Sequence, residues 1–322
     1  ASLTAILPQR TEFSHVAIPF PDASIFRLVS DKKTVLEVAS DLGISVPRQH
    51  TVAAPASLSE SELDILGYPV VVKPHRSVAE GSGHMAEVGV SYADRREELT
   101  RHLRELPRHA FPVLLQERIV GPGVGIFLLI WEGDLIAKFS HRRIRENPPS
   151  GGVSVYRESV PANPGLLDRS RALLERLGWQ GVGIVEYKIR QETGEPYLME
   201  INGRFWGSLQ LAIDAGVDFP RLLVDCALDG NPEIIRNYHT GIRMRWMWGD
   251  VDHLLARLLK SHEKLHLSGV VPNRTEAILD FLRVSPEDRL EVLRLTDPRP
   301  FFVETKAWAK AVLESTLSGD AS

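Results

Sequence analysis

The chain has little cysteine and no long hydrophobic run, and each shortage excludes a class of protein. Cys226 is the only cysteine among 322 residues, so an internal disulfide is impossible and a reducing compartment is favoured. The longest nearly pure apolar run, 124–131, falls far short of the roughly 18 residues that suggest a membrane helix. The N-terminal residues lack the charged leader and long apolar stretch of a signal peptide. We therefore expect a cytoplasmic protein with no membrane segment.

Familiar nucleotide-binding and nucleophilic-catalysis motifs are also absent. The chain contains neither GxxxxGK[ST] nor GxGxxG, which excludes a Walker loop and a dinucleotide fingerprint. No convincing Ser–His–Asp or Cys–His arrangement is present, and Cys226 lies in the apolar stretch RLLVDCALDG, which favours a buried structural thiol. The net charge is −4, so no global basic field indicates a nucleic-acid partner, although a local cationic pocket is compatible with this balance.

Periodicity and turn signals predict an α+β chain with mostly antiparallel sheets. Residues 1–30 show no sustained period, 141–152 reads as a long loop, and 231–322 reads as a mostly helical tail. An acidic helix is expected to begin near Ser59. The other expected helices are 32–42, 94–106, 165–177, 206–215 and 218–229, and the expected strands are 69–73, 85–90, 113–120, 125–130, 134–139, 153–160, 181–189 and 196–201.

The strongest local signal is LMEINGRFWGS, residues 198–208. Glu200 and Asn202 are two apart on a predicted strand, so both side chains emerge on one face. Glu186 lies on the preceding strand and can lie beside Glu200 if the two strands pair across a turn at Gly194. Carboxylate and amide oxygens are the hard ligands that magnesium prefers. A solvated sheet face is the alternative interpretation, and the converging second acid makes the two about equal.

Several cationic and glycine-containing segments could bind anions. Lys73 ends an apolar strand, and the loop after it offers Gly81 and Gly83, whose amides could approach phosphate. Arg204 could neutralise a phosphoryl group or hold a carboxylate. Taken singly, a strand-end lysine, a glycine turn and a surface arginine explain these features equally well or better. The basic segment 141–152 holds Arg142, Arg143 and Arg145, and a solvated loop would look identical.

Two further segments have open interpretations. A predicted strand ends at Gln116, Glu117, Arg118 and Ile119. Backbone groups there could form hydrogen bonds with the edge of an adenine ring, and an ordinary strand end is the alternative. Trp246, Trp248 and Asp250 could cap the active site, form a dimer interface or pack against the module that precedes them, and this packing is favoured.

Together, the motifs resemble the ATP-grasp superfamily over roughly residues 31–230. In order they are DK at 31–32, GISVP at 43–47, VVVKP at 70–74, a glycine loop, QERI at 116–119, HRR at 141–143, VEYK at 185–188 and MEINGRFWGS at 199–208. More narrowly, PPSGGVSVYRESV and EINGRFWGSLQLAIDAGVDFP resemble bacterial proteins described as predicted ATP-dependent carboligases, or carbamoyl-phosphate-synthase-like ATP-grasp proteins.

The resemblance implies two α+β subdomains, about 31–115 and 116–230, that close on ATP, followed by a helical extension, 231–322. Residues 1–30 would be a remnant of, or a linker from, a leading domain that most members carry. A homodimer is left open.

The resemblance also implies roles for individual residues. Lys32 and Lys73 would contact phosphates, and Gly81 and Gly83 would belong to a lid. Gln116, Glu117, Arg118 and Ile119 would form the hinge at adenine. Glu186, Glu200 and Asn202 would hold Mg²⁺, with Mn²⁺ as an alternative, and Arg143 and Arg204 would contact phosphate or the acyl intermediate. Two positions depart from the family pattern: Gly203 replaces the usual proline, and Glu186 replaces an aspartate common in ligase relatives.

The implied activity is an ADP-forming ligation of a small carboxylate to an amine through an acyl phosphate. Two alternatives remain open: a carbamoyl-phosphate-synthase- or carboxylase-like enzyme that activates bicarbonate, and an ATP-binding regulatory protein without turnover.

Overall fold

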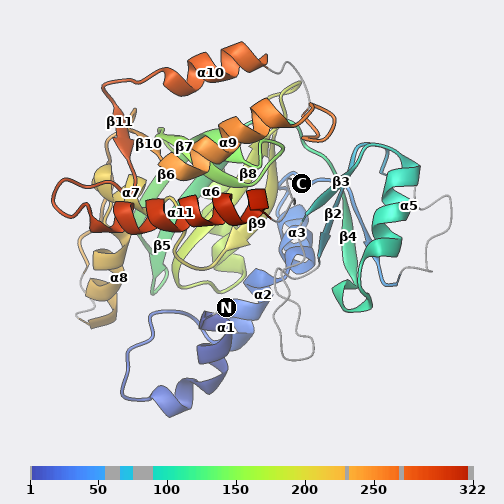
Figure 1. The fold of residues 1–322 in the computed structure, drawn as a ribbon. Helices are drawn as coiled ribbons and strands as arrows, with labels where there is room; N and C mark the ends of the chain where they lie inside the picture. Colours follow the sequence, from blue (N-terminus) through green and yellow to red (C-terminus); the bar gives the residue numbers. More distant parts are fainter. Residues whose placement is uncertain (1, 55–65, 75–89, 229–231, 268–271, 318–322) are drawn as a thin grey trace. The chain divides into compact units, whose positions relative to one another are not determined.

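The computed structural model describes residues 2–54, 66–74, 90–228, 232–267 and 272–317, which divide into two compact units (Figure 1). Unit 1 comprises residues 1–140, 161–206 and 217–238, and unit 2 comprises residues 141–160, 207–216 and 239–322. Helices and antiparallel strand pairs are mixed in both units, which confirms the predicted α+β class. In the described part of the chain, every helix is too short or too polar to cross a membrane.

Unit 1 holds most of the strands. Its helices are α1 (Ser2–Ile6), η1 (Leu7–Phe13), α2 (Ala23–Ser30), α3 (Lys32–Asp41), α5 (Arg96–Glu105), η2 (Arg108–Ala110), α6 (Pro164–Arg176) and α8 (Phe219–Leu228). Its strands are β1 (Gln49–Val52), β2 (Val70–Pro74), β3 (Ser91–Ala93), β4 (Val113–Glu117), β5 (Gly123–Trp131), β8 (Gly181–Ile189) and β9 (Pro196–Asn202). Strand β6 (Asp134–Asn147) begins in unit 1 and ends in unit 2.

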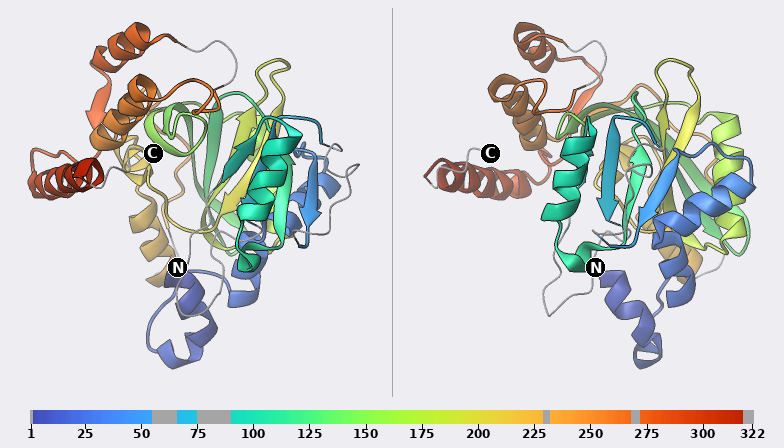
Figure 2. Two further views of the ribbon diagram at one scale, coloured as in Figure 1. Left: turned by 45° about the vertical axis from the view of Figure 1, so that its right-hand side comes forward. Right: turned by 90° about the vertical axis from the view of Figure 1, so that its right-hand side faces the viewer.

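A four-stranded antiparallel sheet in unit 1 has the order β1-β4-β2-β3. Helix α5 lies alongside this sheet and buries Leu99 and Leu103 against it (Figure 2). Alternating valines of β2 supply the other side of that contact, because successive side chains of a strand point to opposite faces. The small core contains Val52, Leu66, Val70, Val72, Ala93, Leu99, Leu103, Val113 and Leu115.

The larger core of unit 1 lies against strands β5, β8 and β9. Strand β8 pairs antiparallel with β5 on one side and with β9 on the other. Helices α3 and α6 bury their apolar residues here, including Val35, Leu36, Leu173 and Leu174. This packing fixes the N-terminus of α3, where Lys32 lies, beside strand β9.

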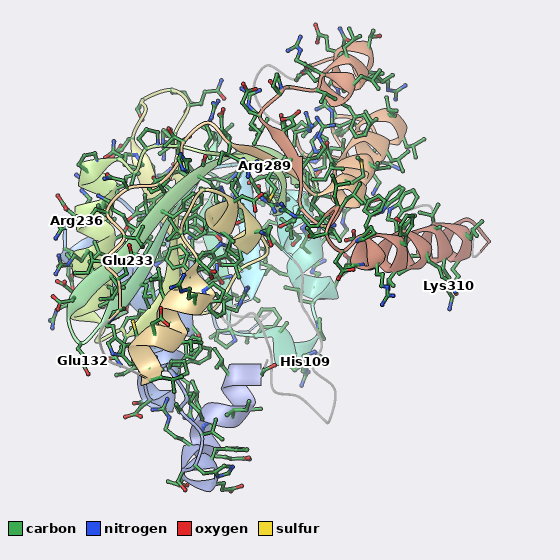
Figure 3. All side chains as sticks on the ribbon, turned by 90° about the vertical axis from the view of Figure 1, so that its left-hand side faces the viewer. His109, Glu132, Glu233, Arg236, Arg289 and Lys310 are labelled. Carbon is green, nitrogen blue, oxygen red and sulfur yellow. The ribbon has the colours of Figure 1, made fainter. Side chains whose placement is uncertain are left out.

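The turn between β5 and β6 shows how local chemistry sets the register. Glu132 and Gly133 both have positive φ, 52° and 86°, which is the geometry of a two-residue hairpin turn. Figure 3 labels Glu132 at this turn. The turn falls between the strands expected at 125–130 and 134–139.

Unit 2 contains β7 (Val153–Ser159), α7 (Leu209–Asp214), β10 (Arg243–Arg245), α9 (Met247–Leu259), α10 (Arg274–Leu282), β11 (Asp288–Leu290) and α11 (Arg299–Leu317). Strand β10 pairs antiparallel with β7 and parallel with β11. The indole of Trp248 stacks on Trp308 with ring centroids 4.2 Å apart, and Trp246 donates a hydrogen bond to Glu304. The tryptophans therefore pack α9 against α11 within unit 2.

Four predicted segments need correction. Residues 141–147 are not a loop, because β6 continues through Asn147 and pairs with β7 around an irregular register at 143–146. Residues 243–245 form a strand inside the expected helical tail, and residues 1–30 contain helices. The helix expected at 206–215 is shorter, since α7 begins at Leu209. The helix expected near Ser59 and the strand at 85–90 lie outside the described residues.

Candidate active site

Two acids and an amide meet on neighbouring strands, as predicted. The register of β8 and β9 places Glu186 directly opposite Glu200 and Ile184 opposite Asn202. The amide nitrogen of Asn202 donates to Glu186 Oε1 at 3.2 Å and to Glu200 Oε1 at 3.0 Å. Gly194, with φ of 71°, supplies the left-handed residue in the connecting turn. The three side chains therefore form one polar cluster, hereafter the acid–amide cluster.

Lys32 extends from the first residue of α3 to this cluster. Its Nζ lies 3.2 Å from Glu200 Oε2, and only 14% of its side chain is exposed. The Asp31 carboxylate caps the helix by accepting from the backbone of Thr34 at 3.0 Å. The DK pair thus has two separate functions: the aspartate starts the helix and the lysine faces the acids.

Lys73 lies on β2 and is held from the neighbouring strand. Its ammonium donates to Gln116 Oε1 at 2.7 Å, and the paired register of β2 and β4 makes the two residues diagonal neighbours. Gln116 is only 2% exposed, and within the described residues its amide nitrogen finds no hydrogen-bond acceptor. An unsatisfied buried amide beside a lysine is a feature that a bound polar ligand would complete.

Electrostatic coupling ties Lys73 to the cluster. The pKa of Lys73 is lowered to about 8: burial is the largest cause, repulsion from Lys32 and Lys188 adds to it, and attraction by Glu200 and Glu186 opposes it. Burial disfavours the charged form of Glu200, but Lys32, Lys73 and the Asn202 hydrogen bond outweigh it, so its pKa is lowered. The lysines and acids therefore form one interacting charge system.

The acid–amide cluster fits a magnesium ion that shares its coordination with phosphate and water. In the described residues no group of three or more His, Cys, Asp or Glu side chains gathers as a complete metal cage. Two carboxylates and an amide oxygen are a partial set of hard donors, and Mg²⁺ is usually held by one or two carboxylates plus substrate phosphates. The Asn202 amide would have to turn its oxygen toward the ion, since here its nitrogen faces both acids.

Ion pairs form at residues 116–119, the segment predicted to be the hinge at adenine. Glu117 accepts from Arg190 at 2.9 Å and from the Arg48 guanidinium at 3.2 Å, so both carboxylate oxygens already have partners. The guanidinium of Arg118 lies over the Tyr92 ring at 4.8 Å, and Ile119 is buried. Sequence reasoning identified this segment without foreseeing that two arginines would hold Glu117.

Gly203 has a clear structural reason. A Cβ at this position would overlap the ring of Trp179, which is itself buried. The indole therefore occupies the space that a side chain at position 203 would need. The neighbouring Arg204 is exposed, and its guanidinium donates to the Phe205 carbonyl at 3.0 Å.

The remaining predicted residues lie elsewhere. Arg143 belongs to unit 2, where it donates to Glu146 at 2.9 Å and to the Gly152 carbonyl at 3.1 Å. Gly81 and Gly83 lie outside the described residues. Cys226 is buried, and burial raises its pKa to about 11, consistent with a structural thiol.

Sequence reasoning missed Lys188 as part of the site. It lies two residues after Glu186 on β8 and contributes to the lowered pKa of Lys73. The two-residue period of a strand, applied to VEYK as it was to the Glu200–Asn202 pair, would have found it.

Comparison with known proteins gives a consistent result. A family model described as ATP-grasp in the biosynthetic pathway with Ter operon matches residues 109–249. A Streptomyces coelicolor protein provisionally named a D-alanine–D-lactate ligase is 31% identical over 196 residues, covering 56% of this chain and 54% of that protein. The alpha subunit of mitochondrial methylcrotonoyl-CoA carboxylase from Arabidopsis thaliana is 26% identical over 212 residues, covering 61% of this chain and 27% of that protein.

This chain therefore spans about half or less of the length of these two curated relatives. Among solved structures, the ADP complex of N5-carboxyaminoimidazole ribonucleotide synthetase has a TM-score of 0.60 at 17% identity, covering 80% of this chain and 65% of that chain. At this identity the likeness establishes the fold. The family match over residues 109–249, the fold likeness and the order of the motifs all point to the ATP-grasp superfamily.

Proposed function

We propose that the protein is an ADP-forming ligase that joins a small carboxylate to an amine. The observation that carries the proposal is the convergence of Lys32, Lys73, Glu186, Glu200 and Asn202, because this set provides cations for a triphosphate beside hard oxygen donors. The relative named as a D-alanine–D-lactate ligase supports ligation of a small carboxylate as the reaction class.

The proposed reaction has two steps. A carboxylate oxygen of the acid attacks the γ-phosphorus of ATP, the bond to the β-phosphate oxygen breaks, and ADP leaves. The amine nitrogen then attacks the acyl carbon, phosphate leaves, and the nitrogen loses a proton. Both reactants of the first step are anions, so catalysis depends mainly on positioning and charge neutralisation.

The residues of the site have distinct roles in this proposal. Lys73 and Lys32 supply positive charge to the phosphates, and Gln116 directs the ammonium of Lys73 through its hydrogen bond. Glu186, Glu200 and Asn202 would hold Mg²⁺, which when bound neutralises charge on phosphate oxygens. Arg204 is free to turn toward an anion, since its hydrogen bond is to an exposed carbonyl next to it in the chain. Arg143 would contact an anionic substrate.

A screen for ADP release tests the proposal. The protein is incubated with ATP, Mg²⁺ and pools of organic acids and amines, and ADP is measured with each pool, with both and with neither. We expect release that requires an acid and rises with an amine. ATP binding without stimulation by any pair would instead favour a nucleotide-binding regulatory protein.

A second candidate reaction activates bicarbonate. The match to a protein named as a carboxylase favours it. Bicarbonate alone, compared with bicarbonate-free organic acids in the same assay, separates the two reactions, because only a bicarbonate-activating enzyme would release ADP without an organic acid.

A further inference from the structure

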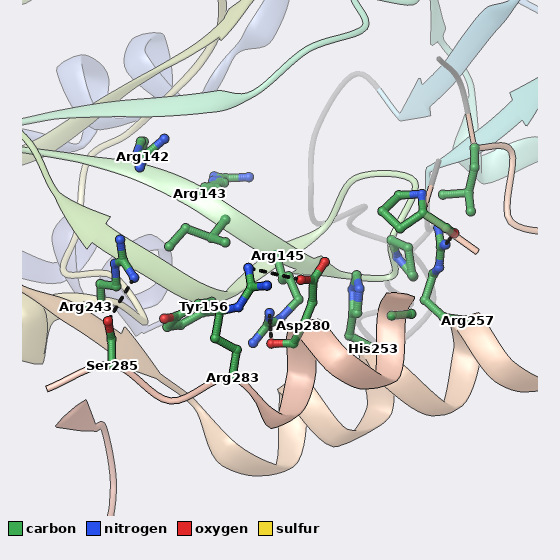
Figure 4. A pocket seen from close by; sticks show the side chains of 15 residues that line it. Arg142, Arg143, Arg145, Tyr156, Arg243, His253, Arg257, Asp280, Arg283 and Ser285 are labelled. Carbon is green, nitrogen blue, oxygen red and sulfur yellow. Dashed lines mark hydrogen bonds and ion pairs between the residues drawn. The ribbon is translucent and has the colours of Figure 1, made fainter. Parts of the chain in front are cut away.

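Unit 2 contains a cavity that the proposed ATP site does not include. It has a volume of about 530 Å³, which is within the usual size of small-molecule sites. The end of β6, strand β7 and helices α9 and α10 surround it (Figure 4). Its lining is dominated by arginines: Arg142, Arg143, Arg145, Arg243, Arg257 and Arg283.

Carboxylates hold several of these arginines in fixed positions. Asp250, which is fully buried, accepts from Arg145 at 2.6 and 2.7 Å. Glu158 accepts from Arg142 at 2.7 Å and from Arg243 at 3.1 Å. Guanidinium groups held in this way are pre-organised, so a ligand that meets them does not have to order them.

The cavity carries more positive than negative charge. Six arginines line it, and within the described part of the chain the carboxylates shown to pair with them are Asp250, Glu158, Glu146 and Asp280. The arginines outnumber these carboxylates. Asp280 is the single acid among the lining residues, and Figure 4 shows it between Arg145 and Arg283.

Arg257 is the least compensated of the six. It is only 6% exposed and donates to the carbonyl of Pro272, and among the described residues no carboxylate pairs with it. Burial lowers its pKa. A buried guanidinium without a counter-ion is costly, so an anion in the cavity would be stabilised by it.

His253 adds a hydrogen-bond acceptor to the cavity. Its Nδ1 lies 2.6 Å from the carbonyl of Glu146, and since a carbonyl can only accept, Nδ1 carries the proton. Burial lowers the pKa of His253 despite this bond and the charge of Asp250, and Arg145 and Arg257 add to the lowering. In the neutral ring, Nε2 is then an acceptor. Ile144, Leu267 and Ala277 provide apolar lining for a short carbon skeleton.

We propose that this cavity binds a small molecule with two or more anionic groups, carboxylate or phosphate, and one O–H or N–H donor directed at His253 Nε2. The inference rests on the proposed ligase function only in making this molecule a substrate. Three of the six arginines come from the end of β6, and the other three and His253 come from residues after 239, so the C-terminal region contributes half of the cationic lining.

Calorimetric titration of the full chain without nucleotide or divalent ion tests the proposal. Citrate, tricarballylate and pyrophosphate serve as probes. We expect citrate or pyrophosphate to bind, with carboxylate and phosphate recognition distinguished by which of the two is stronger. Arg257→Gln should weaken binding by at least about tenfold, as expected for the loss of a charge-assisted hydrogen bond. Arg283→Gln, at an exposed position that tolerates change, should weaken it several-fold.

Arg274→Gln is the matched control, because Arg274 is an exposed arginine on α10 that does not line the cavity. If citrate carries the preferred groups, it should bind more tightly than tricarballylate, which lacks its hydroxyl, and His253→Phe should remove that difference. The proposal is overturned if no probe binds, or if Arg274→Gln weakens binding as much as Arg283→Gln. Binding that depends on Arg283, in a protein that never releases ADP, would support the cavity and refute the ligase.

Discussion

The two charged regions of this protein use their charges differently. In unit 1, the ammonium of Lys32 faces the carboxylate of Glu200, and the ammonium of Lys73 donates to the buried side-chain amide of Gln116. The pKa of Lys73 is lowered to about 8, mainly by burial. In unit 2, guanidinium groups are held by carboxylates, as Arg145 is by the fully buried Asp250. A lysine is a compact charge that exchanges partners, whereas an arginine held by a carboxylate presents a fixed planar fork. We expect the first region to bind and release phosphate groups, and the second to recognise an anionic ligand by the placement of its charged groups.

Replacement of Glu200 should cause the largest loss of activity among the substitutions in the first region. Glu200→Gln keeps the size of the side chain but removes the charge that faces Lys32 and the proposed metal ion. We expect ADP formation to fall by more than about 100-fold with an unchanged circular dichroism spectrum. Glu192→Gln, in the exposed β8–β9 turn, is the control. Full activity in Glu200→Gln would remove Glu200 from the metal site.

Replacement of Asp250 tests whether the second region is structural as well as charged. Asp250→Asn leaves Arg145 and Arg245 without their buried partner. The free energy of unfolding should fall by about 3–5 kcal/mol in denaturant titrations. Asp225→Asn, which removes an exposed pair with Arg221, should change it by less than about 1 kcal/mol. Equal effects would show that Asp250 is not the anchor of these arginines.

Lys73→Ala should weaken ATP binding by about 10- to 100-fold, since it removes a buried charge and leaves Gln116 without its donor. Equilibrium dialysis with labelled ATP measures the change. Lys33→Ala is the matched control, because Lys33 is the exposed neighbour of Lys32 and pairs with Glu37 on its own helix. An unaltered affinity in Lys73→Ala would place Lys73 outside the ATP site.

The pH dependence of ATP affinity sharpens the comparison between lysine and arginine. The folded-state pKa of Lys73, about 8, lies below its ordinary value of 10.5. Its ammonium form is therefore lost as pH rises through about 8, and ATP affinity should decline by a few-fold to tenfold between pH 7 and pH 9.5. In Lys73→Arg the charge persists throughout this range, so the decline should be smaller. Parallel pH profiles for the two proteins would contradict the assignment.

The same pKa shift affects stability with a defined sign. Between about 8 and 10.5 the unfolded chain binds more protons at Lys73 than the folded chain does, so this group makes the protein more stable as pH rises through that window. ATP binding and stability are thus expected to respond to Lys73 in opposite directions.

The acid–amide cluster could be predicted because its cues are local. A two-residue spacing places Glu200 and Asn202 on one face, and a glycine turn sets the register that brings in Glu186. Lys32 came from the family resemblance, and Lys73 was noticed at the end of an apolar strand without a decision between an anion site and an ordinary strand-end lysine. The approach of both to Glu200 depends on long-range packing of α3 and β2. The match between Gly203 and the Trp179 ring likewise exists only in three dimensions.

The basic segment after Phe139 was wrongly predicted as a loop for a physical reason. Arg142, Arg143 and Arg145 resemble a solvated loop when their partners are unknown. The carboxylates that hold Arg142 and Arg145 lie on other segments, Glu158 on β7 and Asp250 on α9, so these pairs cannot be read from the segment's own sequence. Short strands such as β10 carry too few residues to show a period at all.

The contact between Gly203 and Trp179 links two positions that are 24 residues apart in the sequence. In homologous chains these positions are expected to change together: a residue larger than glycine at 203 should occur with a ring smaller than indole at 179. Such paired substitutions would let evolution adjust the aim of Arg204 without touching the arginine itself.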